Sequence, residues 1–327
     1  MSSVSVAPAP PTAPLRPGLK ARLAQLPGAV YLLLVLALGL SIGSPYFLTA
    51  GNLTNILLQT SVVLIVALGM TLVILTEGID LSLGPVLGLA AVVMALLAVS
   101  GWPLLLALAA AIVAAAVVGA VNGVLVACFA LQPFVVTLGT FGISLSLALA
   151  LTDGNSVVNL PPAIRWFNEG TILGVPTPIC ATAAVFAMTW VILHHTRFGR
   201  YIFAIGGNRT ALVRSGVPVT RYHVMVYAYA AALTGLASFI MTARANAAHP
   251  TFGVGIEFDA IAAAVLGGAS FSGGRASLLG TVAGALAVTT LRNGLNLIGV
   301  QTEWQAAAVG VVIILGVAFD TLRGYNR

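Results

Sequence analysis

The chain has 327 residues, of which 59% are hydrophobic and only 7% are charged, and its formal net charge is +6. Soluble domains carry about a quarter charged residues, so this composition excludes an ordinary water-soluble globule. The apolar blocks are long and continuous, and the mean hydropathy is +1.06. Since strands of a membrane β-barrel alternate in hydropathy, the sequence predicts an all-α polytopic membrane protein instead.

Ten apolar segments follow one another along the chain, with polar breaks between them. We expect membrane-spanning helices at about 28–43, 54–76, 82–100, 103–128 and 134–151, one that ends at 195, and four more at about 223–243, 257–272, 277–298 and 304–321. The expected organisation is a disordered cytoplasmic tail (1–27), a transmembrane domain (28–322) and a short cytoplasmic tail (323–327).

The basic residues predict the orientation in the inner (plasma) membrane, because cytoplasmic loops are enriched in Lys and Arg. Arginines and a lysine precede the first span, five arginines fill the loop 197–222, and two more close the chain. Both termini and the arginine-rich loop are therefore expected in the cytoplasm, and the polar segment 152–175 outside. Nucleic-acid binding is not expected, since the arginines alternate with spans and have no aromatic partners.

Two carboxylates interrupt the apolar run at 69–84, GMTLVILTEGIDLSLG. On a helix Glu77 and Asp80 would share a face, because residues three apart are neighbours. In mid-membrane each ionised carboxylate would cost roughly 2.5–3.5 kcal/mol. Gly78 and Pro85 permit a turn or a broken helix. The local pattern favours a short turn whose acids face water over a buried break that lines a path.

A second acidic motif, GVGIEFDAIAAAVLGGASFSGG, contains Glu257 and Asp259. Because these residues are two apart, a regular helix would place them on different faces. The glycines that follow lack the spacing of a phosphate-binding loop, so they predict close helix packing or a tight turn rather than a nucleotide site.

Two pairs of motifs suggest an internal duplication. The tetrapeptide 78–81, GIDL, is echoed at 255–258 by GIEF, and Asn122-Gly123 is echoed by Asn293-Gly294. The halves are five spans apart, so they would insert in opposite directions. Inverted five-helix halves are typical of transporters, whose substrate path lies between the halves.

The arginine-rich loop contains a predicted short helix, with Asn208 as its N-cap and Gly216 as its C-terminal breaker. A small amphipathic helix between spans is a surface that another protein could bind. By contrast, the sequence has no nucleophile elbow, no HExxH motif and no CxxC or His-rich ligand set, so neither an enzyme, a metal site nor a cofactor is expected.

Five of these stretches together resemble a known family: GMTLVILTEGIDLSLG, VNGVLVACFALQPFVVTLGT, TRFGRYIFAIGGN with SGV, DAIAAAVLGGASFSGG and RNGLNLIGV. They are similar in order and position to the permease subunits of bacterial monosaccharide ABC importers of the ribose, arabinose, xylose and galactofuranose type. The resemblance extends from about residue 30 to the C-terminus. The wider superfamily includes branched-chain amino-acid permeases, but GIDLS is typical of the sugar branch.

The resemblance implies a permease that performs no covalent chemistry and works with other proteins. These are a cytoplasmic ABC ATPase subunit, a second permease subunit (the same chain or a homologue) and a periplasmic sugar-binding protein, all at the membrane. It also implies that the segment around 206–217 couples to the ATPase, with the candidate residues Gly206, Gly207, Asn208, Arg209, Thr210, Ala211, Arg214, Ser215 and Gly216. Arg209 and Thr210 stand where family members often carry acidic residues.

The path for the sugar needs polar groups that meet hydroxyls briefly without holding them, because tight binding slows release. The candidates are Asp80, Glu77, Asn122, Gln132, Asn293, Asn296, Glu257 and Asp259. Asp80 is the stronger family feature, since the position of Glu77 is usually small or neutral. For any one amide, a hydrogen bond between helices is the more ordinary role.

Two other functions remain open from the sequence. One is a stand-alone proton- or sodium-coupled carrier, in which the Glu77/Asp80 or Glu257/Asp259 carboxylates would couple the ion. The other is a branched-chain amino-acid permease. Residue patterns do not name the sugar.

Overall fold

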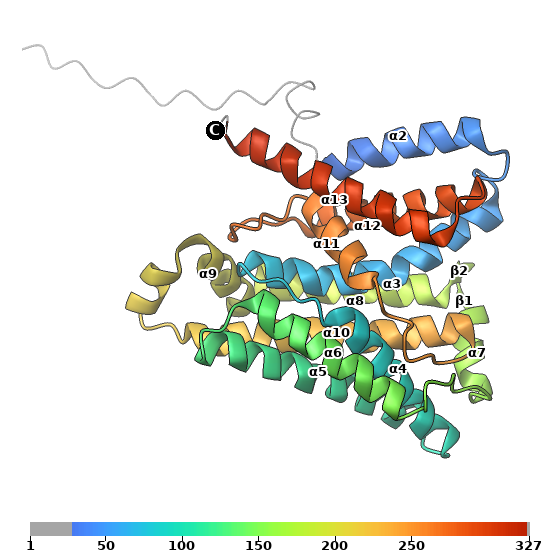
Figure 1. The fold of residues 1–327 in the computed structure, drawn as a ribbon, viewed down its shortest axis with the longest axis horizontal. Helices are drawn as coiled ribbons and strands as arrows, with labels where there is room; N and C mark the ends of the chain where they lie inside the picture. Colours follow the sequence, from blue (N-terminus) through green and yellow to red (C-terminus); the bar gives the residue numbers. More distant parts are fainter. Residues whose placement is uncertain (1–27, 326–327) are drawn as a thin grey trace, which may run out of the picture.

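The computed structural model describes residues 28–325, and their side chains as far as residue 315; the predicted tail 1–27 lies outside this part of the chain. The described residues form twelve helices and one two-stranded sheet, which confirms the all-α class (Figure 1). The elements are α2 (Gly28–Gly43), α3 (Ala50–Leu75), α4 (Leu83–Val99), α5 (Leu104–Cys128), α6 (Pro133–Ala150), α7 (Pro162–Glu169), β1 (Thr171–Ile172), β2 (Val175–Pro176), α8 (Thr177–His195), α9 (Arg197–Arg214), α10 (Val219–Ala245), α11 (Ile256–Leu266), α12 (Leu278–Leu297) and α13 (Thr302–Tyr325).

Each of the ten predicted apolar segments contains a helix, but the helices differ in length. Among the described residues, α3, α5, α6, α8 and α10 are long and apolar enough to cross a membrane. The predicted span 257–272 is wrong at its end: α11 stops at Leu266, because Gly267 and Gly268 follow and Gly268 has a φ of +94°. Two helices, α4 and α11, are short and buried.

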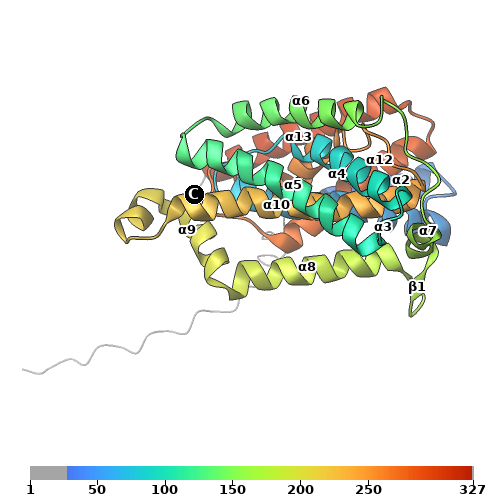
Figure 2. The same cartoon turned by 90° about the horizontal axis from the view of Figure 1, so that it is seen from below.

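The long helices lie roughly along one direction, with α9 at one end of the bundle and α7, β1 and β2 at the other (Figures 1 and 2). We call these the α9 end and the α7 end. The hairpin pairs Thr171 with Pro176 and Ile172 with Val175, and a β-bridge ties Val157 to Ala248. The segment between α6 and α8 is therefore folded against the bundle.

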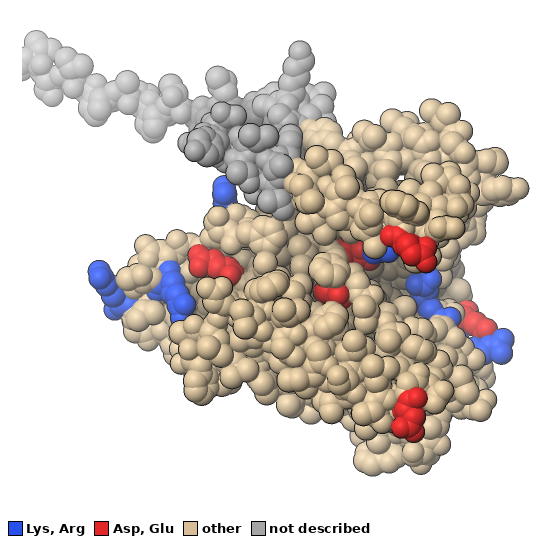
Figure 3. Space-filling model, in the orientation of Figure 1, with Lys and Arg blue, Asp and Glu red and all other residues tan. Residues whose placement is uncertain are grey.

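The core lies around α3, which is buried from Thr60 to Leu75, whereas α5, α6 and α8 expose many large apolar side chains. Exposed apolar surface of this extent needs a non-aqueous surrounding. Figure 3 shows that most of this face is uncharged, with Lys and Arg mainly towards its two ends and a few acidic residues between them. Both features indicate a membrane protein with α3 near its centre.

Two antiparallel helix pairs give the bundle its internal order. Helix α3 runs against α12, and hydrogen bonds between their side chains follow the whole contact: Asn52 with Asn293, Thr60 with Thr289, and Thr71 with Thr281. Helix α5 runs against α10 through small residues instead. At Gly119 and Gly123 the backbones of the two helices are so close that a Cβ on α5 would overlap the backbone of α10.

These pairs fit the predicted inverted halves. In the first half α3 is followed by the short α4, then α5 and α6; in the second α10 is followed by the short α11, then α12 and α13. Helices α4 and α11 each pack on the two helices that follow them, and α3 runs antiparallel to α10 where Gly69 meets Ala230. The same packing order thus recurs in opposite directions.

Candidate functional site

The acidic motif 76–82 forms the break between α3 and α4. Glu77 adopts a φ of +63° at the end of α3 and is exposed, whereas Asp80 is completely buried. One carboxylate oxygen of Asp80, Oδ1, accepts hydrogen bonds from the Ser82 backbone N–H (2.9 Å) and from the Ser82 hydroxyl (2.6 Å). Asn122 of α5 donates its side-chain N–H to the same hydroxyl at 2.9 Å. Asp80 therefore fixes the start of α4 and connects it to α5.

The prediction of a turn whose acids face water is right for Glu77 and wrong for Asp80. The carboxylate of Asp80 is buried in an apolar surrounding, and the two donors of Ser82 replace water at one of its oxygens, Oδ1, whereas Oδ2 has no hydrogen-bond partner among the described residues. The helix dipole adds to this, because α4 begins at Leu83 and a negative charge is favourable near a helix N-terminus.

The second acidic motif occupies the corresponding place at the start of α11. Gly255 (φ +97°) precedes the helix, and its N–H donates to both carboxylate oxygens of Glu257, at 3.1 and 2.9 Å. Asp259 accepts hydrogen bonds from Arg292 Nη2 (2.7 Å) and Nε (3.1 Å) on α12. Both carboxylates are buried, and they accept hydrogen bonds from different groups.

The two short helices meet at their N-termini. A Cβ at Gly84 would overlap the Glu257 carboxylate, and a Cβ at Gly253 would overlap the Gly84 carbonyl oxygen. One turn later, Gly88 lies against the Pro250 carbonyl. The absence of side chains at these glycines lets the two chain breaks cross at backbone distance, which places Asp80 and Glu257 on either side of one crossing.

Three of the four predicted amides connect helices. Besides Asn122, Asn293 exchanges two hydrogen bonds with Asn52, and Asn296 accepts one from Gln305 at 2.7 Å. Gln132 is exposed at the start of α6, and Asn296 is exposed near the end of α12. The partners Ser82, Asn52 and Gln305 were not singled out from the sequence, because isolated Ser, Asn and Gln residues carry no spacing signal.

Arg292 was also missed, although one signal for it existed. It is a lone arginine inside an otherwise uncharged helical segment, and such a residue needs a buried acid nearby. The second half contains four acids, Glu257, Asp259, Glu303 and Asp320, so the sequence alone did not identify which of them pairs with Arg292.

Helix α9 confirms the local prediction at Asn208. The backbone leaves helical geometry there (φ −158°, ψ 84°), and Asn208 Oδ1 accepts a hydrogen bond from the Ala211 N–H at 2.9 Å, as an N-cap does. The short helix ends before Gly216, which has a φ of +76°. Among the predicted coupling residues only Gly206 is buried; all the others are exposed.

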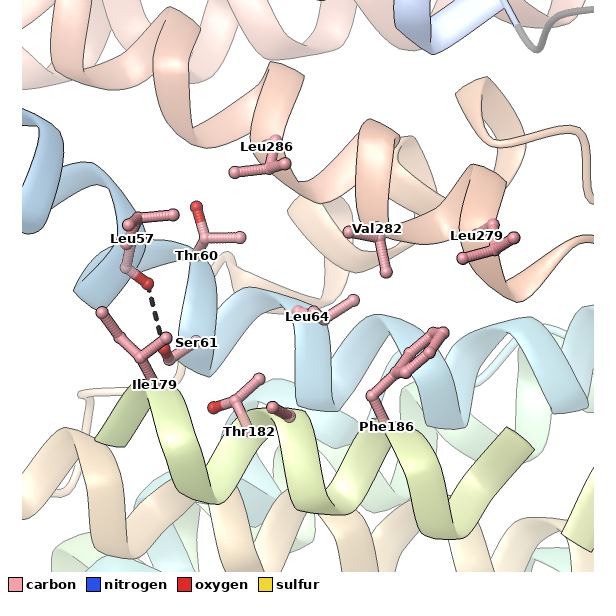
Figure 4. A pocket seen from close by; sticks show the side chains of 11 residues that line it. Leu57, Thr60, Ser61, Leu64, Ile179, Thr182, Phe186, Leu279, Val282 and Leu286 are labelled. Carbon is pink, nitrogen blue, oxygen red and sulfur yellow. Dashed lines mark hydrogen bonds between the residues drawn. The ribbon is translucent and has the colours of Figure 1, made fainter. Parts of the chain in front are cut away.

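An apolar cavity of about 290 Å³ lies between α3, α8 and α12 (Figure 4). Its polar side chains are already engaged: Ser61 donates to the Leu57 carbonyl, Thr182 to the Pro178 carbonyl, and Thr60 is paired with Thr289. Leucine, isoleucine, valine and phenylalanine side chains form most of the remaining wall. A sugar, which needs free hydrogen-bonding groups, does not fit this chemistry.

Comparison with known proteins identifies the family. Residues 52–317 match the family described as branched-chain amino acid transport system / permease component. The chain belongs to this permease family. It is 46% identical to the ribose import permease protein of Escherichia coli K12 over 88% of this chain and 91% of that protein. It is also 43% identical to the ribose import permease protein of Bacillus subtilis, over 88% and 90%.

A third relative in this permease family is the D-allose transport system permease protein of Escherichia coli K12, 37% identical over 89% of this chain and 90% of that protein. No solved structure matches the chain. These relatives confirm the resemblance to the sugar branch, and they make the chain a membrane permease component rather than an enzyme.

Proposed function

We propose that this chain is the membrane permease subunit of an ATP-driven importer for a monosaccharide. The observation that carries the proposal is its similarity to ribose import permeases, which extends over nine-tenths of both chains. Because a sugar is also named for the more distant relatives, the comparisons favour this function over amino-acid import. Ribose is the first sugar to test.

In this function the α9 end faces the cytoplasm. Five exposed arginines surround it: Arg197, Arg200, Arg209, Arg214 and Arg221. At the α7 end Arg165 is paired with Glu169 (2.7 Å), so the charges there are mixed. The positive-inside rule then places both termini in the cytoplasm and the segment 152–175 in the periplasm, where a sugar-binding protein would deliver its ligand.

The exposed part of α9, residues 207–216, is the docking surface for the ATPase subunit in this proposal. It follows α8 and precedes α10 in the chain, and it projects beyond the bundle at that end (Figure 2). A second permease, either another copy or a homologue, would complete the path.

The predicted path residues fall into two groups. Gln132 and Asn296 are exposed and are our candidates for contact with sugar hydroxyls, whereas Glu77, although exposed, packs beside Gly273 and is not assigned to the path. Asp80, Asn122, Asn293, Glu257 and Asp259 are buried and bonded within the bundle, so we assign them to the frame of the path. A carrier that used these carboxylates to bind a coupling ion would have to break the helix-start contacts described above.

Uptake of labelled ribose in cells tests the function. We expect uptake by this chain with its ATPase and binding protein, loss of uptake when the ATPase gene is deleted, and little effect of an uncoupler at constant ATP. Uptake that survives deletion of the ATPase and disappears with the uncoupler would support a stand-alone carrier instead. Labelled allose and galactose in the same cells test the choice of sugar.

A further inference from the structure

Helix α9 consists of two parts that differ in their surroundings. From Arg197 to Gly206 it packs on the bundle, with Gly199, Ile202 and Ile205 buried. After the bend at Asn208 it is largely exposed. We call residues 207–216 the tip. Gly206 is the last buried residue before the tip, so it is the point at which the N-terminal side of the tip joins the bundle.

Gly206 lies directly against a hydrogen bond between two other segments. The Gly274 N–H donates to the Leu75 carbonyl oxygen at 3.0 Å, which joins the end of α3 to the turn after α11. A methyl group at Gly206 would overlap both atoms of this bond, the Leu75 oxygen and the Gly274 nitrogen. Any residue larger than glycine at position 206 would therefore push apart the segments that carry Gly206, Leu75 and Gly274.

The turn 270–275 is built to fill the remaining space. The Ser270 N–H donates to the Arg275 carbonyl at 3.0 Å, and Gly273 and Gly274 have φ values of +72° and +70°. A Cβ at Gly273 would lie 2.7 Å from Glu77 Cγ and 2.8 Å from Gly206 Cα. The Glu77 side chain, at the end of α3, therefore packs beside Gly273 at the same contact.

Each segment at this contact leads to one of the two short helices. Beyond Leu75, the break 76–82 leads to Asp80 and the start of α4. Before the turn, Gly267 and Gly268 connect back to the end of α11. The crossing of Gly84 and Gly253 lies at the start of α4 and just before the start of α11, one helix length from the turn in the case of α11. A shift at Gly206 thus has short routes to both helices that border the crossing.

We propose that the backbone contact of Gly206 with Leu75 and Gly274 is the point at which movement of the tip is transmitted to α4 and α11. Gly206 is a positioning residue in this account: it is buried and cannot touch the ATPase itself. The inference rests on the proposed function, because it takes the ATPase as the source of the movement.

The test compares Gly206→Ala with Gly39→Ala in the complete transporter, reconstituted in proteoliposomes with its ATPase and binding protein. Gly39 is an exposed glycine within α2 with no atom near its Cβ position, so it controls for adding a methyl to a helix. We expect Gly206→Ala to bind the ATPase and hydrolyse ATP within threefold of wild type while sugar uptake falls at least tenfold. Gly39→Ala should match wild type in all three.

A second variant tests the same contact if Gly206→Ala does not assemble. Glu77→Gly should fold, since glycine adopts a φ of +63° without strain, but it removes the Cγ that packs on Gly273. We expect at least a threefold fall in sugar imported per ATP hydrolysed. Unchanged coupling in every variant that assembles would overturn this inference alone, whereas a wild-type complex that imports no sugar would contradict the proposed function.

Discussion

Asp80 carries a carboxylate buried in an apolar core, and a few hydrogen-bond donors stabilise it there. Its Oδ1 serves the backbone and the hydroxyl of Ser82, and Asn122 secures that hydroxyl from a neighbouring helix. Glu77, three residues earlier, is exposed and serves no such group. Substitution of Asp80 should therefore lower the stability of the protein more than substitution of Glu77.

We expect Asp80→Ala to lower the stability of the protein by roughly 1–3 kcal/mol, because it leaves the buried N–H and hydroxyl of Ser82 without their acceptor. Asp80→Asn keeps an acceptor oxygen and should cost less. Thermal unfolding in detergent measures both, with Glu77→Gln as the exposed control. If Asp80→Ala unfolds at the same temperature as Glu77→Gln, Asp80 does not hold the start of α4.

At the scale of elements, α4 and α11 are short helices that begin inside the bundle and are attached in different ways. Helix α4 is joined to α5 through the neutral side chains of Ser82 and Asn122, whereas α11 is joined to α12 through the ion pair of Asp259 and Arg292. The ion pair is mostly buried, with side-chain exposures of 6% for Asp259 and 25% for Arg292.

Breaking this ion pair on one side should be costly, because the remaining buried charge loses its partner. We expect Arg292→Leu to destabilise the protein by about 3 kcal/mol, and Asp259→Leu with Arg292→Leu to recover part of that loss. Arg165→Leu, which removes an exposed partner of Glu169, should change little. Unfolding midpoints of the four proteins decide this, and equal midpoints for Arg292→Leu and Arg165→Leu would contradict it.

For the whole molecule, the distribution of charge predicts the orientation, which labelling can test. In a background with Cys128 and Cys180 replaced by alanine, Leu173→Cys presents a thiol at the α7 end and Ser215→Cys one at the α9 end; both positions are exposed. A membrane-impermeant maleimide should label only Leu173→Cys in intact cells and both after lysis. Labelling of Ser215→Cys in intact cells would reverse the proposed orientation.

Local chemistry was sufficient to predict part of this structure. The apolar blocks predicted the helices, and Asn208 was predicted as an N-cap because a cap needs only its own neighbours in sequence. The echo of Asp80 at Glu257 also proved informative, since both residues stand at the start of a short buried helix.

Contacts between distant segments could not be predicted in this way. The burial of Asp80 depends on Asn122, 40 residues from Ser82, and that of Asp259 on Arg292, 33 residues away. A turn in water and a capped break in a core have the same local sequence. The role of Gly206 was likewise hidden, because its partners Leu75 and Gly274 come from two other parts of the chain.

The most direct test of an ATP-driven permease is uptake into proteoliposomes that contain this chain and its ATPase, with the sugar-loaded binding protein outside. ATP sealed inside should drive uptake of labelled ribose with no ion gradient, and a proton or sodium gradient without ATP should drive none. Uptake by this chain alone, driven by an ion gradient and indifferent to ATP, would contradict the account.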